Sequence, residues 1–132
     1  MSTLAVGTIK SISSAAPVFQ NTSGTEKGQL IKIWCHFDAT GVSQTIKDSF
    51  NVSSLTDQGV GFTDVNFTNA MSDTNYCAVI YNNARDPAAI NAFGNDFVGG
   101  MILETGKIKL SAYNGTSFTD SEIFNLIIIG DN

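Results

Sequence analysis

The chain is poor in charged residues. Only 14% of its 132 residues are Asp, Glu, Lys or Arg, and the seven basic residues are scattered along the chain. The formal net charge is −5, so the protein has no electrostatic reason to bind the phosphate backbone of a nucleic acid. We therefore expect no nucleic-acid partner.

Long apolar stretches are also missing. No run approaches the roughly 18 residues of a membrane-spanning helix, and the longest, Leu126 to Ile129, is typical of a buried strand. The first seven residues lack the basic start and apolar core of a signal peptide. We expect synthesis in a cytoplasm and no insertion into a membrane.

The chain has only two cysteines and one histidine. In a cytosol, Cys35 and Cys77 are expected to be free thiols that pack as small apolar side chains, with a disulfide between them as the alternative. Cys35 and His36 are neighbours on one strand and point to opposite faces, so they cannot form a nucleophile–base pair. A Cys77–His36 pair is sterically conceivable, but no orienting third residue supports it. We expect no catalytic residues and no enzymatic activity.

Clusters of metal ligands are absent from the sequence pattern. The Asp residues are isolated from one another and lack the spacing of a calcium loop. The Asp- and Asn-rich loops leave calcium binding open as an alternative to plain solvation. We expect neither a metal nor a cofactor.

What the sequence does have is Gly, Asn, Ser and Thr in abundance, together with nine Phe and three Tyr. This composition favours strands and tight turns over helices, and 132 residues suit one domain with its own core. Seven strand-like runs alternate with turn residues: 31–37, 45–55, 62–69, 76–81, 97–104, 108–113 and 122–129. The pattern predicts an all-β fold, an antiparallel β-sandwich of jelly-roll type.

The first run indicates which face is inside. The inward face carries four apolar side chains, Ile31, Ile33, Cys35 and Phe37. Trp34 and His36 then point outward, where a large aromatic residue is typical of an interface. The run 76–81 is almost wholly apolar, which predicts a strand buried on both faces.

The run 108–113 alternates, so that Ile108, Leu110 and Ala112 are expected to point inward, and Lys107, Lys109 and Ser111 outward. Residues 56–61 are expected to form a hairpin connection.

Residues 1–28 differ from the remainder, 29–132. Their apolar residues are sparse, so the segment cannot bury itself alone. We expect it to be extended and to be ordered by packing on another chain; a tail pinned to the domain is the alternative. The residues expected at a subunit interface are Trp34, His36, Val18, Phe19, Leu4 and Val6.

Several segments of the chain resemble those of a known family. They are Ser2–Ile9, Ala16–Gln20, Gly24–Trp34, Lys47–Asp57, Val65–Met71 and Asn75–Tyr76. In this order they resemble tail-fibre-like virion proteins of tailed bacteriophages that infect aquatic bacteria, and the similarity spans about residues 2–81. Cys35-His36 stands where the family usually has Val-Asn, and Ser72 where it usually has Pro.

The resemblance implies a virion structural component without enzymatic activity, a small tail-fibre or fibre-tip subunit that forms a homotrimer. Residues 1–28 would attach to other virion proteins, and the tip of the loop 82–96 would contact a glycan or protein of the host surface. The residues expected at that contact are Arg85, Asp86, Asn91 and Asn95. The tail is the favoured location.

Two other readings stay open. The same architecture on the head would be a capsid decoration protein. A carbohydrate-binding module is the second reading, because aromatic faces suit the apolar faces of sugars. The aromatic residues considered for it are Trp34, Tyr76, Tyr81 and Tyr113.

Overall fold

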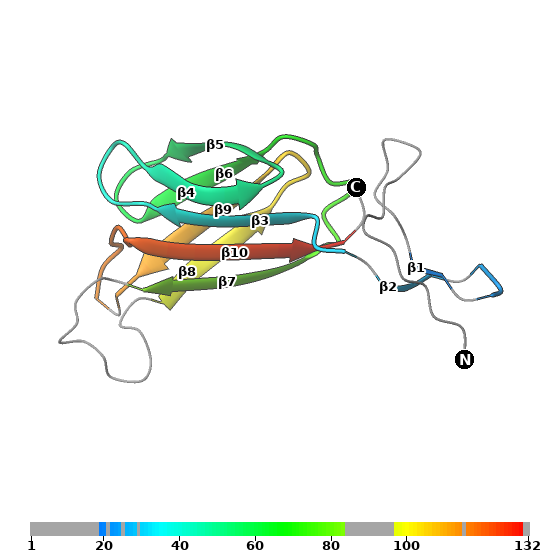
Figure 1. The fold of residues 1–132 in the computed structure, drawn as a ribbon. Helices are drawn as coiled ribbons and strands as arrows, with labels where there is room; N and C mark the ends of the chain where they lie inside the picture. Colours follow the sequence, from blue (N-terminus) through cyan, green and yellow to red (C-terminus); the bar gives the residue numbers. More distant parts are fainter. Residues whose placement is uncertain are drawn as a thin grey trace. The chain divides into compact units, whose positions relative to one another are not determined.

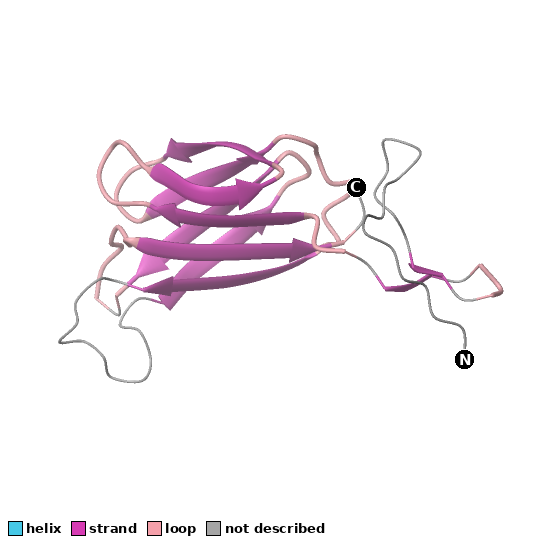
Figure 2. Ribbon diagram, viewed as in Figure 1, coloured by secondary structure: helices cyan, strands magenta, loops and turns pink. Residues whose placement is uncertain are grey.

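The protein is an all-β molecule. The computed structural model describes residues 19–20, 22–24, 26–28, 30–83, 97–114 and 116–130, and these form strands and no helix (Figure 2). The chain divides into two compact units, Met1–Leu30 and Ile31–Asn132. The predicted all-β antiparallel sandwich is confirmed, because the second unit packs two antiparallel sheets against each other.

The first unit contains one short ribbon. Strands β1 (Phe19–Gln20) and β2 (Glu26–Gly28) pair antiparallel, with Phe19 opposite Gly28. Gly24 between them has a positive φ of 76°, the left-handed conformation that turns use and glycine adopts freely. Leu4, Val6 and Val18, expected at an interface, lie outside the described residues, and only the backbone of Phe19 is described.

The sandwich has a front sheet and a back sheet in the view of Figure 1. The front sheet has the strand order β4 (Thr45–Phe50), β3 (Ile33–Asp38), β10 (Ile123–Ile129), β7 (Cys77–Asn83). The back sheet has the order β5 (Val52–Asp57), β6 (Phe62–Phe67), β9 (Lys107–Tyr113), β8 (Phe97–Leu103). Every neighbouring pair is antiparallel.

The core lies between the two central strand pairs. Alternate residues of β3 and β10 face those of β6 and β9, as the two-residue period of a strand requires. The Phe37 and Phe124 rings, directly opposite in register, stack with centroids 4.9 Å apart. The almost fully buried side chains from these strands are Ile33, Cys35, Phe37, Val65, Ile108, Leu110, Ala112, Phe124, Leu126 and Ile128. The predicted inward faces of 31–37 and 108–113 are therefore confirmed, except that Ile31 is 46% exposed.

The predicted single strand 45–55 is wrong. Asn51 has a φ of 59° and interrupts it, so that β4 belongs to the front sheet and β5 to the back sheet. Asn tolerates the left-handed region better than most residues. Its side chain is held by Asn69, whose backbone N–H donates to Asn51 Oδ1 at 2.8 Å. One residue thus passes the chain from one layer of the sandwich to the other.

The prediction that the run 76–81 is buried on both faces is also wrong. Strand β7 is an edge strand, with Val79 58% and Tyr81 54% exposed. The apolar run of β10 likewise divides, since Leu126 is buried and Ile127 is 39% exposed. Apolar composition on both faces therefore reflects an apolar outer surface here, which periodicity alone cannot distinguish from burial.

The β5–β6 hairpin, predicted at 56–61, is confirmed and is anchored to the segment between β9 and β10. Gly61, with a φ of 78°, donates its N–H to Asp120 Oδ1 at 2.8 Å. A Cβ at Gly61 would lie 2.7 Å from the backbone nitrogen of Thr119. This close approach fixes the hairpin, and with it Phe62, against the segment before β10.

Candidate functional site

The outer face of the front sheet carries an apolar row of four residues, Phe50, Trp34, Ile127 and Val79. Trp34 lies opposite Phe50 on one side and opposite Ile127 on the other, and Ile127 lies opposite Val79. Residues directly opposite in an antiparallel pair project to the same face, with Cβ atoms about 5 Å apart. Phe50 is 54% exposed and Trp34 is half-buried. The row therefore crosses all four strands of the sheet.

More apolar surface adjoins this row. Tyr81 and Ile129 lie two residues along β7 and β10 on the same face and are both substantially exposed. The exposed Cys77 lies opposite Ile129. The next row is polar, with His36 between Asp48 and Asn125. Trp34 and His36 thus both point outward, as predicted, and the apolar row has a polar border.

The two thiols do not form a reactive pair with the histidine. Cys35 faces the core, and burial, together with the nearby Asp48 carboxylate, raises the pKa of its thiol to about 12. Cys77 is opposite Ile129, whereas His36 is opposite Asn125. Four residues along β10 correspond to about 14 Å. The Cys77–His36 pair is therefore excluded, and both cysteines are free, as predicted.

The other predicted contact residues lie outside the described part of the chain. Arg85, Asp86, Asn91 and Asn95 belong to residues 84–96, which the structure does not describe. Of the tyrosines considered for sugar binding, Tyr76 is buried and donates its hydroxyl to the Glu104 carbonyl oxygen at 3.0 Å. Tyr113 packs edge-on against Phe118 with ring centroids 5.5 Å apart.

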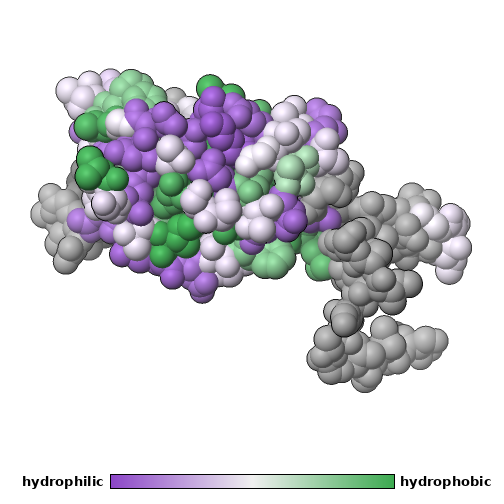
Figure 3. Space-filling model, turned by 90° about the horizontal axis from the view of Figure 1, so that it is seen from above, coloured by the Kyte–Doolittle hydropathy of each residue, from purple (hydrophilic) through white to green (hydrophobic). Residues whose placement is uncertain are grey.

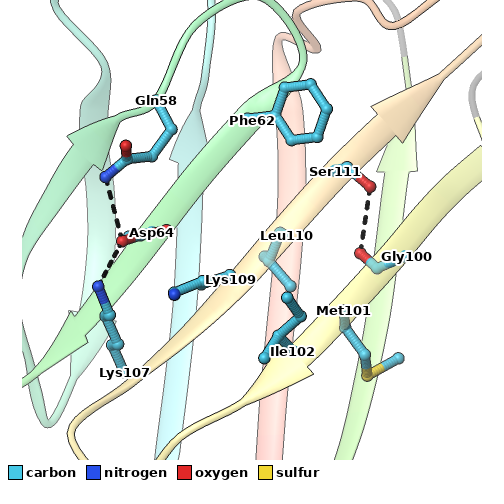
Figure 4. A pocket seen from close by; sticks show the side chains of 10 residues that line it. All are labelled: Gln58, Phe62, Asp64, Gly100, Met101, Ile102, Lys107, Lys109, Leu110 and Ser111. Carbon is cyan, nitrogen blue, oxygen red and sulfur yellow. Dashed lines mark hydrogen bonds and ion pairs between the residues drawn. The ribbon is translucent and has the colours of Figure 1, made fainter.

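A hollow of about 620 Å³ opens on the outer face of the back sheet. It lies over β6, β9 and β8 and is bordered by Gln58 of the β5–β6 hairpin (Figure 4). Its volume is within the range of small-molecule sites. Its lining consists of Gln58, Phe62, Asp64, Gly100, Met101, Ile102, Lys107, Lys109, Leu110 and Ser111.

One side of the hollow is a polar network around Asp64 (Figure 4). This residue is only 3% exposed, and its Oδ2 accepts hydrogen bonds from Lys107 Nζ at 2.7 Å and Gln58 Nε2 at 3.2 Å. The hydrogen bond to Asp64 raises the pKa of the Lys107 ammonium. Lys109 Nζ pairs with Glu104 Oε1 at 2.7 Å. The four charges therefore cancel locally.

The opposite side of the hollow is apolar. Phe62 is 38% exposed, and its ring packs on Phe118 with centroids 4.5 Å apart. Ile102 of β8 lies opposite Lys109 on this outer face and is 59% exposed, whereas Met101, 45% exposed, lies opposite the buried Leu110 and borders the hollow along the edge strand. Figure 4 shows the polar side chains of Gln58, Asp64 and Lys107 on one side and the apolar ones on the other. The hollow therefore presents both kinds of surface to one ligand.

The strand pattern alone could not identify this hollow. Lys107, Lys109 and Ser111 were expected to point outward, and they line it. Asp64 joins Lys107 across 43 positions of sequence. That pairing depends on the register of β6 with β9, and strand order cannot be read from the periodicity of single strands.

The rim of the sandwich differs from its two outer faces. Seen from above, the molecule is mainly hydrophilic, and its apolar residues form small separate groups (Figure 3). Among the described residues there is no cluster of three or more metal-ligating side chains. Nor does any described helix have the length and apolarity to cross a membrane. The two outer sheet faces are therefore the candidate functional surfaces of the described residues.

No family model matches this chain, and the comparisons with curated proteins and with solved structures found no match.

Proposed function

We propose that the protein is a structural component of a bacteriophage virion, a small tail-fibre or fibre-tip subunit that assembles as a homotrimer. The observation that carries the proposal is the apolar row across the front sheet. A soluble monomer gains nothing from four adjacent apolar side chains on an outward face, whereas a subunit buries them.

A second copy of the chain is the occupant that fits this row best. The row spans four strands, about 14 Å at the usual strand spacing, and its polar border of His36, Asp48 and Asn125 resembles the rim of a subunit interface. Three front sheets turned toward a common axis would bury their Trp34 side chains together. The resemblance of several segments to tail-fibre-like proteins favours the same assembly.

Light scattering after size exclusion tests the proposal. We expect the wild type to be a trimer and the double variant W34S/I127S to be a monomer, because each substitution removes apolar area from the centre of the row. V60S is the matched control, since Val60 is 65% exposed on the β5–β6 turn and lies outside the row. Circular dichroism checks that both variants retain their sheets.

A wild-type monomer at all accessible concentrations contradicts the assembly. A trimer that survives W34S/I127S would assign the interface to another surface. Density for the protein on the tail of an imaged virion is expected, whereas density on the head would replace the tail-fibre role by capsid decoration.

A further inference from the structure

We infer that the hollow on the back sheet binds a neutral sugar residue. This inference does not depend on the proposed assembly, because the hollow lies on the sheet opposite the apolar row. It also places sugar recognition at Phe62 and Asp64, neither of which the sequence pattern indicated.

The first reason is the unused hydrogen-bonding capacity of a buried carboxylate. Asp64 accepts both of its hydrogen bonds at Oδ2, and no described residue donates to Oδ1. A carboxylate has about four acceptor sites, and an ammonium group has three donors. Lys107 Nζ uses one donor on Asp64. A hydroxyl group can donate to Asp64 and accept from Lys107, which is what adjacent sugar hydroxyls offer.

The second reason is the division of the lining into a polar and an apolar side. A pyranose ring has one face of C–H groups and an edge of hydroxyls, so it needs both surfaces within one ring width. Phe62 supplies the flat apolar surface, and its ring packs against that of Phe118. The aromatic ring is rigid, so little conformational entropy is lost when a ligand packs on it.

The third reason is charge. Asp64 pairs with Lys107, and Glu104 pairs with Lys109. With each cation already neutralised, the hollow does not present the uncompensated cluster of positive charge that a phosphate group requires. The balance favours an uncharged polar ligand, so a neutral hexose fits better than an acidic sugar or a phosphate.

Backbone-resolved NMR titration tests the inference. The probes are the methyl glycosides of glucose, galactose, mannose and N-acetylglucosamine, with inorganic phosphate as the charged comparison. We expect at least one glycoside to give saturable shifts at the amides of Gln58, Asp64 and Gly100, with a dissociation constant in the millimolar range that a single exposed sugar site allows. Phosphate is expected to give none.

Two variants test the roles of the lining. D64N keeps the shape but weakens the acceptor, so binding should fall by about tenfold to hundredfold. F62L keeps an apolar side chain against Phe118 but removes the aromatic face, so binding should fall by about tenfold. F50L is the matched control, because Phe50 is an exposed aromatic residue of the other sheet, and its affinity should equal that of the wild type.

The inference is overturned if no glycoside binds the wild type, if phosphate binds more tightly than every glycoside, or if both variants bind as the wild type does. Repeating the titration with W34S/I127S separates this result from the assembly. Binding that persists in that monomer supports the sugar site whatever the fate of the trimer.

Discussion

Among single residues, the two thiols lie in different environments of the front sheet, one in the core and one on the outer face. Cys35 is 1% exposed within the core, and Cys77 is exposed on the outer face. A thiol reacts as the thiolate. A buried thiol with a raised pKa is therefore unreactive for two reasons: reagents do not reach it, and it keeps its proton. The chain has no other cysteine, so its thiol chemistry can be assigned without ambiguity.

We predict that, in the W34S/I127S variant, a chromogenic disulfide reagent labels one thiol quickly and the second only as fast as the protein unfolds. The variant C77S should abolish the fast phase and leave the slow one. Two fast phases would contradict the burial of Cys35.

Cys35 also gives the stability a defined dependence on pH. Its pKa is 9.0 in the unfolded chain and about 12 in the folded one, so the unfolded state loses the proton first. The contribution of the protonated Cys35 thiol to the free energy of unfolding is fully present below pH 9 and is lost as pH rises toward 12. Over this pH range, the equilibrium constant for unfolding should rise by up to about tenfold per pH unit because of this one group. Denaturant titrations of C35A should show a shallower decline over the same range.

At the scale of elements, Asn51 decides how the strands are distributed between the sheets. The side chain of Asn51 makes three hydrogen bonds with Asn69: two to Oδ1, from the backbone nitrogen and from Nδ2, and one from Asn51 Nδ2 to the Asn69 carbonyl oxygen. The positive φ and this side-chain pairing act together. Both favour the passage from β4 of one sheet to β5 of the other at this single residue.

We predict that N51V destabilises the fold more than N51G does. Valine in the left-handed region costs about 1–2 kcal/mol and also loses the hydrogen bonds to Asn69. Glycine adopts the same φ freely, so N51G should lose only the three hydrogen bonds, each worth about 0.5–1.5 kcal/mol. Chemical denaturation measures both. Equal losses would mean that the Asn69 pairing, and not the backbone conformation, holds the crossover.

The sequence predicted elements better than their arrangement. Alternation identified the inward faces of β3 and β9, because burial on one face leaves a period of two. It failed at 45–55, where Asn51 breaks the backbone without breaking the pattern, and at β7 and β10, where both faces are apolar. It also could not bring Asp64 next to Lys107, since that contact depends on register between strands that are distant in sequence.

At the scale of the whole molecule, an apolar face is combined with a negative net charge. Each copy carries −5, with a sequence pI near 4.5. Copies that meet through the apolar row must therefore overcome mutual repulsion, which salt screens. Ionic strength thus distinguishes an interface of apolar contacts from one of ion pairs.

We predict that association tightens as the salt concentration rises from about 0.1 M to about 1 M, because the Debye length falls from about 10 Å to about 3 Å. Sedimentation equilibrium measures the change, with W34S/I127S as the variant that should stay monomeric throughout. Weaker association at high salt would indicate an interface held by charge pairs.

The opposite placement of the two outer faces has a consequence for avidity. In the proposed assembly, sheets that meet around an axis through their front faces would turn their back faces outward, so every copy would add one outward hollow. A site that holds a single sugar only weakly would then engage a repetitive glycan at several points at once. The second and later contacts would form at high effective concentration, so that firm adhesion to a surface would need no tight individual site.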